Sequence, residues 1–156
     1  MSTTSAKLET ILQNLEKVVL QIPFNRMLGL QIKEIQQNHI MMAFAMKPDL
    51  VGNFLYGILH GGVISSVLDM AGGMAAMVSV IHKKIDETEV ETLAERLGKV
   101  STIDLQVSYI RPGKGESFTA KAQAAHTGNK ISFTTMELFN EQDKLIARGS
   151  GTYLIS

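Results

Sequence analysis

The sequence contains no cysteine among its 156 residues. Disulfide bridges, zinc-thiolate sites and thiol nucleophiles are therefore excluded together, and the absence is consistent with a reducing compartment. An excess of charge is missing too, because 15 basic residues balance 15 acidic ones. This balance argues against a dedicated nucleic-acid binder, which usually carries a basic excess on one face, and leaves room only for local basic patches.

Long uninterrupted apolar segments are also absent. Residues 1–17 mix charges into apolar positions and lack the apolar region of a signal peptide, which indicates a cytoplasmic protein. The least polar stretch, residues 61–81, contains Asp69, serines and many small residues, so it predicts a buried helix and not a membrane span. The length and the 45% hydrophobic content predict a single domain over residues 1–156, with residues 1–22 as an N-terminal helical cover.

Three helices are predicted from periodicity. Apolar residues recur at helical spacing over residues 7–20, which predicts an amphipathic helix that ends before Pro23. The helix that begins near Gly61 is apolar nearly all round, which marks it as the central buried helix. Thr88 and Glu91 have the spacing of a capping box and predict a short surface helix after it.

Short alternating runs predict strands on both sides of the central helix. Two runs precede it and four follow it: residues 29–36, 40–47, 102–111, 116–126, 130–140 and 144–155. The connectors between the last four are rich in glycine, proline, asparagine and aspartate, which implies hairpins and an antiparallel sheet. The sequence therefore predicts an α+β fold in which the sheet curls about one long helix.

Residues 57–73 carry the most informative motif, a His-Gly-Gly turn directly before the central helix. Gly61 and Gly62 allow close approach of a ligand to the backbone and supply free amides at a helix start. Asp69 is an acid among apolar and small neighbours, and burying an unpaired charge is costly. Together these residues suggest an oxyanion site facing a base.

The chain resembles the hotdog-fold acyl-CoA thioesterases of the PaaI-like group, and over nearly its whole length it is similar to the YigI-type medium- and long-chain acyl-CoA thioesterases. The resemblance is carried by PFNRMLGL at 23–30, VGNFLYGILHGGVISSVLDMAGG at 51–73, TIDLQVSYIRPGKGE at 102–116 and GNK at 128–130. It implies a curved antiparallel sheet wrapped around a long central helix, with an extra N-terminal helix. It also implies hydrolysis of acyl-CoA thioesters to free fatty acid and coenzyme A.

The resemblance further implies a homo-oligomer, either a dimer or a dimer of dimers. It implies no metal and no cofactor, since coenzyme A is part of the substrate, and it implies neither nucleic-acid binding nor membrane insertion.

Roles for the motif residues follow from the same resemblance. The Gly61 amide would bind the thioester oxygen, helped by the helix dipole, while Gly62 would mainly permit close packing. Asp69 lies about two helical turns further on, too far for both groups to serve one carbonyl within a subunit. Asp69 is therefore expected to act as general base or nucleophile on a substrate held by the partner subunit's Gly61. A capped or paired interface aspartate is the alternative.

Other polar residues near the motif have competing interpretations. Histidine is often an acid–base catalyst, but the resemblance favours a structural role for the His60 ring in the loop over proton transfer. Asn53 could donate to the thioester carbonyl or the catalytic water; it lies seven residues before His60, whereas many relatives place that asparagine six before, so a loop-forming asparagine competes equally. Thr102 occupies the position where related enzymes carry a hydroxyl that bonds the attacking water, although it could be an ordinary strand threonine. Asp104 is a less favoured alternative base.

Two further groups are candidates for substrate binding. Arg111, Lys114 and Lys130 lie in or beside turns where the coenzyme A phosphates should bind, with solvated turn charges as the alternative. Met70 and Met74 lie at helical spacing and could line a pocket for acyl chains of differing length, although core packing is the more common meaning of such methionines.

Three other functions stay open from the sequence. A hotdog dehydratase or hydratase would use a catalytic histidine on a β-hydroxyacyl thioester, and the absence of a dehydratase-type histidine loop argues against it. A non-catalytic acyl-CoA binding module would keep the fold and could dispense with Asp69. Acyl-carrier-protein thioesters could replace coenzyme A esters, and a preference for the free coenzyme A ester would distinguish the two.

Overall fold

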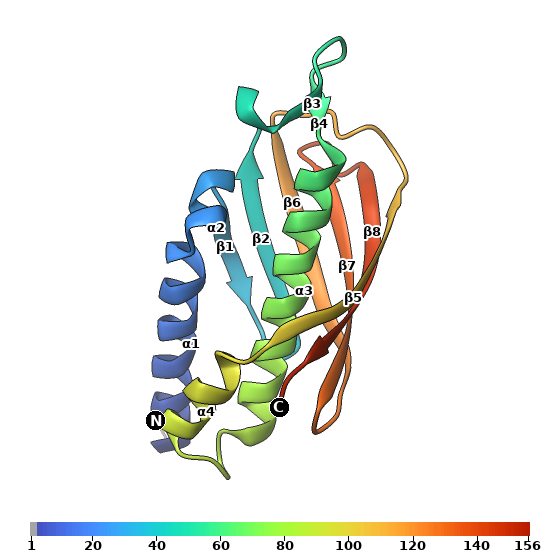
Figure 1. Cartoon of the computed structure of the whole chain (residues 1–156). Helices are drawn as coiled ribbons and strands as arrows, with labels where there is room; N and C mark the ends of the chain where they lie inside the picture. Colours follow the sequence, from blue (N-terminus) through green and yellow to red (C-terminus); the bar gives the residue numbers. More distant parts are fainter. Residues whose placement is uncertain (1–2) are drawn as a thin grey trace.

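An antiparallel sheet of six strands curves around one long helix in the computed structural model of the chain, which describes residues 3–156 (Figure 1). The strand order is β1-β2-β6-β7-β8-β5. The strands are β1 (Gln31–Ile35), β2 (His39–Ala45), β5 (Ser101–Tyr109), β6 (Ser117–Thr127), β7 (Ile131–Asn140) and β8 (Leu145–Leu154). The predicted α+β arrangement is confirmed.

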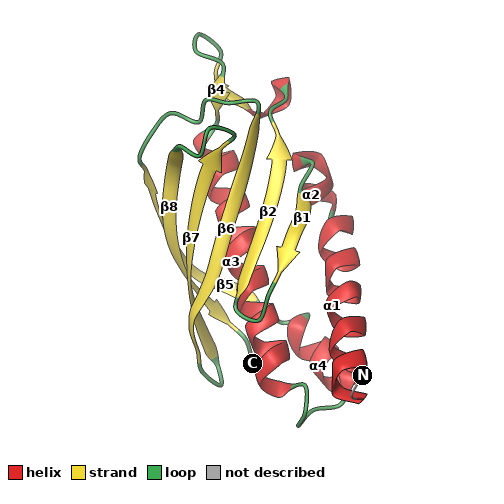
Figure 2. Ribbon diagram, turned by 180° about the vertical axis from the view of Figure 1, so that it is seen from behind, coloured by secondary structure: helices red, strands yellow, loops and turns green. Residues whose placement is uncertain are grey.

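The central helix α3 (Gly61–Lys84) lies against the concave face of the sheet, which Figure 2 shows from behind. Small and apolar side chains surround its middle, and residues 71–76 are all buried because β6, β7 and β8 pack on them. Length and composition alone would allow α3 to span a membrane, yet 67% of its most apolar window is buried inside the protein. This is the burial expected of a core helix.

Strands β2 and β6 bury alternate side chains, as a strand with one face on the core should. Phe118, Ala120 and Ala122 of β6 point to the core, as do Ile40, Met42 and Phe44 of β2. The rings of Phe44 and Phe118 stack with their centroids 5.3 Å apart. One face of the sheet is therefore packed on α3, and the other carries the polar residues.

The N-terminal helix α1 (Thr3–Gln21) buries Ile11, Leu15 and Val19, one turn apart, against the core. Proline 23 does end this helix, but it also begins a second helix that the sequence analysis missed, α2 (Pro23–Leu28). The first helical position tolerates proline because its N–H would lack a partner anyway. The side chain of Asn25, fully buried, donates to the Val19 carbonyl at 2.8 Å and ties the two helices together. Residues 1 and 2 of the predicted N-terminal cover lie outside the described residues.

The capping box predicted at Thr88 and Glu91 is wrong. Helix α4 (Val90–Leu97) has Glu89 as its N-cap residue, and no side chain caps its first turn. Its register is set by Leu93 and Leu97, which are buried on one face. Tertiary packing of this amphipathic face therefore positions α4, with no help from local capping.

A small hairpin, for which the sequence analysis made no prediction, precedes α3. It consists of a 3₁₀ turn η1 (Pro48–Leu50) followed by β3 (Val51–Asn53) and β4 (Ile58–Leu59). The Leu50 carbonyl accepts from the His60 N–H at 2.9 Å, which fixes the hairpin at the start of α3. The hairpin therefore determines how the chain enters the central helix.

Candidate active site

The start of α3 leaves one backbone amide available. His60 is the N-cap residue, and its Nδ1 accepts from the Gly62 N–H at 2.8 Å. The next amides, of Val63 and Ile64, donate to the His60 carbonyl at 3.0 and 3.3 Å. Within residues 3–156, no acceptor is recorded for the Gly61 N–H. This amide therefore lies at the positive end of the helix dipole, free to bind a developing negative charge.

The imidazole of His60 is held by close packing. A Cβ added to Gly62 would lie 2.9 Å from His60 Nδ1, and one added to Gly52 would lie 2.4 Å from His60 Cα. Both positions therefore require glycine for the histidine to sit where it does. Because Nδ1 accepts a hydrogen bond, only Nε2 can serve as a donor in this arrangement.

Asn53 shapes the hairpin. Its side-chain oxygen accepts from the Leu55 N–H at 3.1 Å, and its carbonyl accepts from the Gly57 N–H at 2.9 Å. The arrangement is an Asx turn, in which the side chain replaces a backbone acceptor. The structure thus places Asn53 in the loop-forming role that competed with substrate binding, while its side-chain amino group has no recorded acceptor within residues 3–156.

Asp69 is half-buried and accepts two hydrogen bonds on the same oxygen. The Thr102 hydroxyl donates to Oδ1 at 2.9 Å, and the Tyr153 hydroxyl donates to Oδ1 at 3.0 Å. No donor to Oδ2 is recorded within residues 3–156. The carboxylate is therefore anchored through one oxygen, and the other is available as a base. Thr102 thus lies beside the predicted base, whereas Asp104 accepts from Thr152 at 3.2 Å.

Tyr153 is a site residue that the sequence analysis missed. Only 2% of it is exposed, and burial, followed by the negative charge of Asp69, raises the pKa of its phenol far above the ordinary value of 10.0. The hydroxyl therefore stays protonated as a donor. Its position in an alternating strand gave no local signal, since it lies 84 residues from Asp69 in the sequence.

A second tyrosine lies at the Gly61 end of the site. The Tyr109 hydroxyl donates to the Gly61 carbonyl at 3.1 Å, and the side chain is 54% exposed. Leu59, Gly61, Tyr109 and Arg111 line a hollow of about 280 Å³ there. This hollow gives access to the start of α3.

The three predicted phosphate ligands do not gather at one place in the chain. Arg111 and Lys114 border a hollow of about 700 Å³ that Lys144 also lines. Lys130 lies at the other end of β8: its carbonyl accepts from the Ile155 N–H, whereas the Arg111 N–H donates to the Ile146 carbonyl. The Arg111 guanidinium also donates to the Leu145 carbonyl at 2.9 Å, which leaves further N–H groups for a ligand.

The two predicted acyl-chain methionines differ in burial. Met74 is completely buried in the core, whereas Met70, beside Asp69, is only partly buried. A Cβ on Gly72, between them, would meet Tyr153, Thr134 and Met136. Met74 therefore contributes to the packed core of the chain, and Met70 lies closer to the surface.

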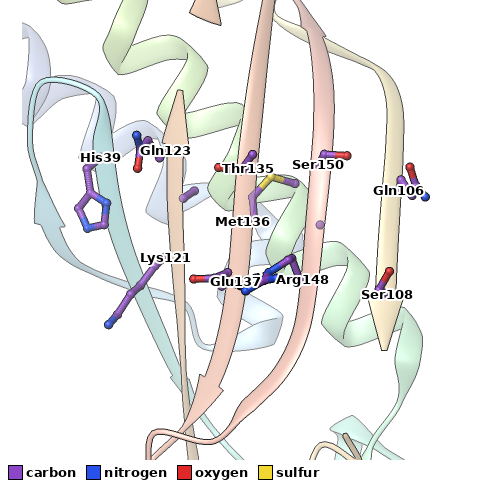
Figure 3. A pocket seen from close by; sticks show the side chains of 12 residues that line it. His39, Gln106, Ser108, Lys121, Gln123, Thr135, Met136, Glu137, Arg148 and Ser150 are labelled. Carbon is purple, nitrogen blue, oxygen red and sulfur yellow. Dashed lines mark hydrogen bonds and ion pairs between the residues drawn. The ribbon is translucent and has the colours of Figure 1, made fainter. Parts of the chain in front are cut away.

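The outer face of the sheet carries a separate polar hollow of about 580 Å³ (Figure 3). Arg148 forms an ion pair with Glu137 across neighbouring strands there, at 2.6 Å, and Lys121 and His39 stand nearby. The lining residues include neither Gly61 nor Asp69. The hollow is therefore distinct from the candidate active site.

Comparisons with known proteins bear on the family and the fold of the chain. The model of the thioesterase superfamily matches residues 56–147. The chain is 42% identical to the medium/long-chain acyl-CoA thioesterase YigI of Escherichia coli K12 over 142 residues, which cover 90% of each protein. A crystal structure from Shewanella oneidensis related to the thioesterase superfamily superposes with a TM-score of 0.92 at 40% identity, covering 96% of this chain and 97% of that one. The Escherichia coli PaaI protein, from the phenylacetic acid degradation operon, shares the fold with a TM-score of 0.75 at 19% identity, covering 95% and 94%.

Proposed function

The chain belongs to the thioesterase superfamily and is an acyl-CoA thioesterase with the hotdog fold, and from this premise we propose that it hydrolyses medium- to long-chain acyl-CoA esters at a site shared by two subunits. Gly61 of one subunit supplies the oxyanion donor, and Asp69 of the other supplies the base. The acyl-chain preference rests on the similarity to YigI. The partial burial of Met70 beside Asp69 agrees with an acyl chain passing at this point.

The observation that carries this proposal is that the site has two halves, one at Gly61 and one at Asp69, which lie at opposite ends of β5. We call them half-sites. Tyr109 contacts the Gly61 carbonyl at one end, and Thr102 contacts the Asp69 carboxylate at the other. Along α3, eight residues separate Gly61 from Asp69, which is a rise of about 12 Å. A single thioester carbonyl cannot meet both groups of one chain.

The free edge of β5 offers a way to unite the half-sites. Only β8 is hydrogen-bonded to β5 in the sheet, and Ile103 and Tyr109 on β5 are more than half exposed. Unprotected edges of this kind favour pairing with another strand, and two-fold dimers are the commonest oligomers. Antiparallel pairing of two β5 strands about an axis near Gln106 sets the Tyr109 end beside the partner subunit's Thr102. The same pairing brings Lys130 closer to the partner subunit's Arg111, so that the basic residues of the two subunits lie nearer to one another.

The proposed reaction begins with a water molecule between Asp69 Oδ2 and the thioester carbon. Asp69 takes a proton as the water oxygen attacks, and the negative charge that develops on the carbonyl oxygen is stabilised by the partner's Gly61 N–H. The tetrahedral intermediate then collapses, and the carbon–sulfur bond breaks. The proton on Asp69 passes to the departing thiolate, which restores the carboxylate and releases coenzyme A and the fatty acid.

Substrate binding completes the proposal. Arg111, Lys114 and Lys130 bind the phosphates of coenzyme A, and no metal or further cofactor takes part. We further propose that the enzyme acts in fatty acid metabolism in the cytoplasm, a role that the expected fatty acid product and the cysteine-free sequence support. Pairing of dimers into tetramers remains compatible with this site, because the site needs only one β5 interface.

Complementation between two inactive variants tests the shared site. Gly61→Pro removes the amide donor with little disturbance, because Gly61 is the first helical residue and the extended backbone of His60 suits a following proline. Its matched control, Gly61→Ala, keeps the amide and adds the same Cβ near the Tyr109 ring. Mixing Gly61→Pro with Asp69→Asn subunits should restore about one quarter of wild-type activity, since half of the dimers are hybrids with one intact site each.

Two outcomes would overturn the shared site. Subunit exchange shown by mass spectrometry with no recovery of activity would mean that both groups act within one chain. Equal loss in Gly61→Pro and Gly61→Ala would mean that the amide is not the donor. A panel of acyl-CoA esters assayed by thiol release tests the chain length separately, and a higher kcat/KM for short esters than for medium or long ones would contradict that part.

A further inference from the structure

We propose that Tyr153 is a positioning residue for the thioesterase reaction: it holds Oδ1 of Asp69 so that Oδ2 stays directed at the attacking water. The proposal rests on the proposed role of Asp69 as the base. Tyr153 itself touches neither substrate nor water in this scheme and acts only through the carboxylate.

One hydroxyl makes a pair of contacts with Asp69. The Tyr153 hydroxyl lies 3.0 Å from Asp69 Oδ1 and 3.0 Å from the Asp69 backbone carbonyl. A group that bridges the side chain and the main chain of the same residue restricts the rotation of that side chain. Thr102, which is paired with Tyr153 in the β5–β8 register, donates to the same Oδ1. Two neighbouring strands thus fix one oxygen of the carboxylate.

The Tyr153 ring lies in a narrow slot lined by glycines. A Cβ on Gly72 would lie 2.6 Å from the Tyr153 hydroxyl, and one on Gly151 would lie 2.7 Å from Cε2 of the ring. Gly73 adds a third wall, where a Cβ would lie 3.3 Å from Cε1. Two adjacent glycines in the middle of a helix are unfavourable for the helix itself. Their presence is explained by the close approach of the tyrosine, which leaves its ring no alternative position.

The surroundings of the hydroxyl keep it protonated. Burial first, and then the charges of Asp69 on α3 and Asp104 on β5, raise the pKa of Tyr153, and the Thr134 hydroxyl on β7 lies beside it. The phenol therefore stays protonated throughout the pH range of an esterase assay. It donates to Asp69 at every pH at which the carboxylate can act as a base.

Removing the hydroxyl should affect the base in a specific way. A carboxylate that loses a hydrogen-bond donor is less stable in its charged form, so a higher pH is needed to deprotonate it. Tyr153→Phe should therefore move the acid limb of the kcat profile to higher pH. It should also lower kcat by about tenfold or more, in the usual range for a mispositioned base, while KM stays within a few-fold.

Tyr56→Phe is the matched control, because it removes the same group from an exposed tyrosine for which no side-chain hydrogen bond is recorded within residues 3–156. Its pH profile should superpose on that of the wild type. If Tyr153→Phe fails to fold by circular dichroism, 3-fluorotyrosine incorporated at position 153 keeps the ring and gives a more acidic donor. The acid limb should then move to lower pH, opposite to the shift expected for the phenylalanine.

A double-mutant cycle with Asp69→Asn separates this proposal from the one it rests on. In the Asp69→Asn background, Tyr153→Phe should cause no further loss of kcat, because no base remains to be positioned. Full additivity, or an unshifted acid limb in both Tyr153 variants, would overturn the positioning role. Wild-type turnover in Asp69→Asn alone would instead overturn the base assignment itself.

Discussion

Asp69 is the one acid in α3, and donors on the neighbouring strands β5 and β8 explain why it can be tolerated there. Two hydroxyl donors compensate its partial burial, so no positive partner is needed. Neutral donors stabilise the carboxylate without forming an ion pair that would occupy both oxygens. The residue thus combines an anchored oxygen with a free one, which suits a base better than a structural cap.

We predict that Asp69→Asn lowers kcat by about two orders of magnitude or more and leaves KM within a few-fold, as loss of a general base should. The amide keeps an acceptor for Thr102 and Tyr153, so the fold should survive. Steady-state kinetics with one long-chain ester is the measurement. A large rise in KM with unchanged kcat would place Asp69 in substrate binding instead.

His60 should tolerate replacement better than Asp69 does. Its Nδ1 caps the first turn of α3, and asparagine is a good N-cap residue, whereas alanine loses the cap at a cost of about 1 kcal/mol. We predict that His60→Asn retains kcat within about tenfold and that His60→Ala mainly lowers stability. Urea unfolding and kinetics on both variants check this. Equal loss of turnover in His60→Asn and Asp69→Asn would show a catalytic histidine.

The basic residues can be separated by their contacts. The side chain of Lys114 has no recorded hydrogen bond within residues 3–156, whereas Arg111 also holds the Leu145 carbonyl. We predict that Lys114→Ala raises KM for acyl-CoA without changing kcat, and that salt raises the wild-type KM because screening acts over about 8 to 10 Å. Arg111→Ala should raise KM too.

An acyl-pantetheine, which lacks the nucleotide phosphates, is the control substrate for this prediction. Lys114→Ala should hydrolyse it as the wild type does. Equal impairment of Arg111→Ala on the full and the truncated ester would assign Arg111 to the fold and not to phosphate binding.

Among the elements, β5 should carry the dimer interface. The chain has no cysteine, so a single introduced thiol can be linked only to the same residue of a second chain. We predict that Gln106→Cys, in the middle of the free edge strand, gives a covalent dimer with a short bismaleimide. Lys33→Cys, exposed on the opposite edge strand β1, is the control and should stay monomeric on a denaturing gel. Linkage through Lys33→Cys alone would place the interface at β1.

Elements with a regular period could be predicted from the sequence, and those fixed by tertiary contacts could not. The strand over residues 130–140 was found within one residue of β7 because turn-forming residues bound it on both sides, Gly128-Asn129 before it and Glu141-Gln142-Asp143 after it. Helix α2 was missed because proline is compatible both with the end of one helix and with the first position of the next, and only the end of α1 was assigned to Pro23. The capping box at Thr88 failed because packing of Leu93 and Leu97 set the helix start.

The site shows the same division. The amide of Gly61 and the acid at Asp69 belong to one continuous motif, so both could be predicted from a single stretch of the sequence. Tyr153 and the separation of Lys130 from Arg111 depend on which strands pair, and strand pairing is set by contacts distant in the sequence. Glycines 72 and 73 in a buried helix were the one available hint that a bulky group approaches α3.

The stability of the whole molecule should depend on pH at both ends of the range. Burial lowers the pKa of His82 from 6.5, so the folded state favours its neutral form, and that contribution is lost as the pH falls below 6.5. The raised pKa of Tyr153 has the opposite consequence: the folded state keeps the proton, and stability is lost as the pH rises above 10.0.

We therefore predict a broad maximum of unfolding free energy between these limits, measured by urea titration across the pH range. His82→Gln should flatten the acid side, and Tyr153→Phe should flatten the alkaline side. If either variant leaves the dependence of unfolding free energy on pH unchanged, other groups govern the loss of stability at that end of the pH range.

The order of strands in the sheet has a consequence for how the molecule assembles. Strand β5 precedes β6 and β7 in the sequence, yet its only hydrogen-bonded neighbour in the sheet is β8, which begins at Leu145. Pairing distant segments is slow, so β5 must wait until the intervening strands have formed their hairpins. We therefore expect a first-order folding phase to precede a concentration-dependent association phase. Until β8 has been synthesised, β5 has no strand partner within its own chain, so this interval is the one in which the nascent chain is most exposed to aggregation.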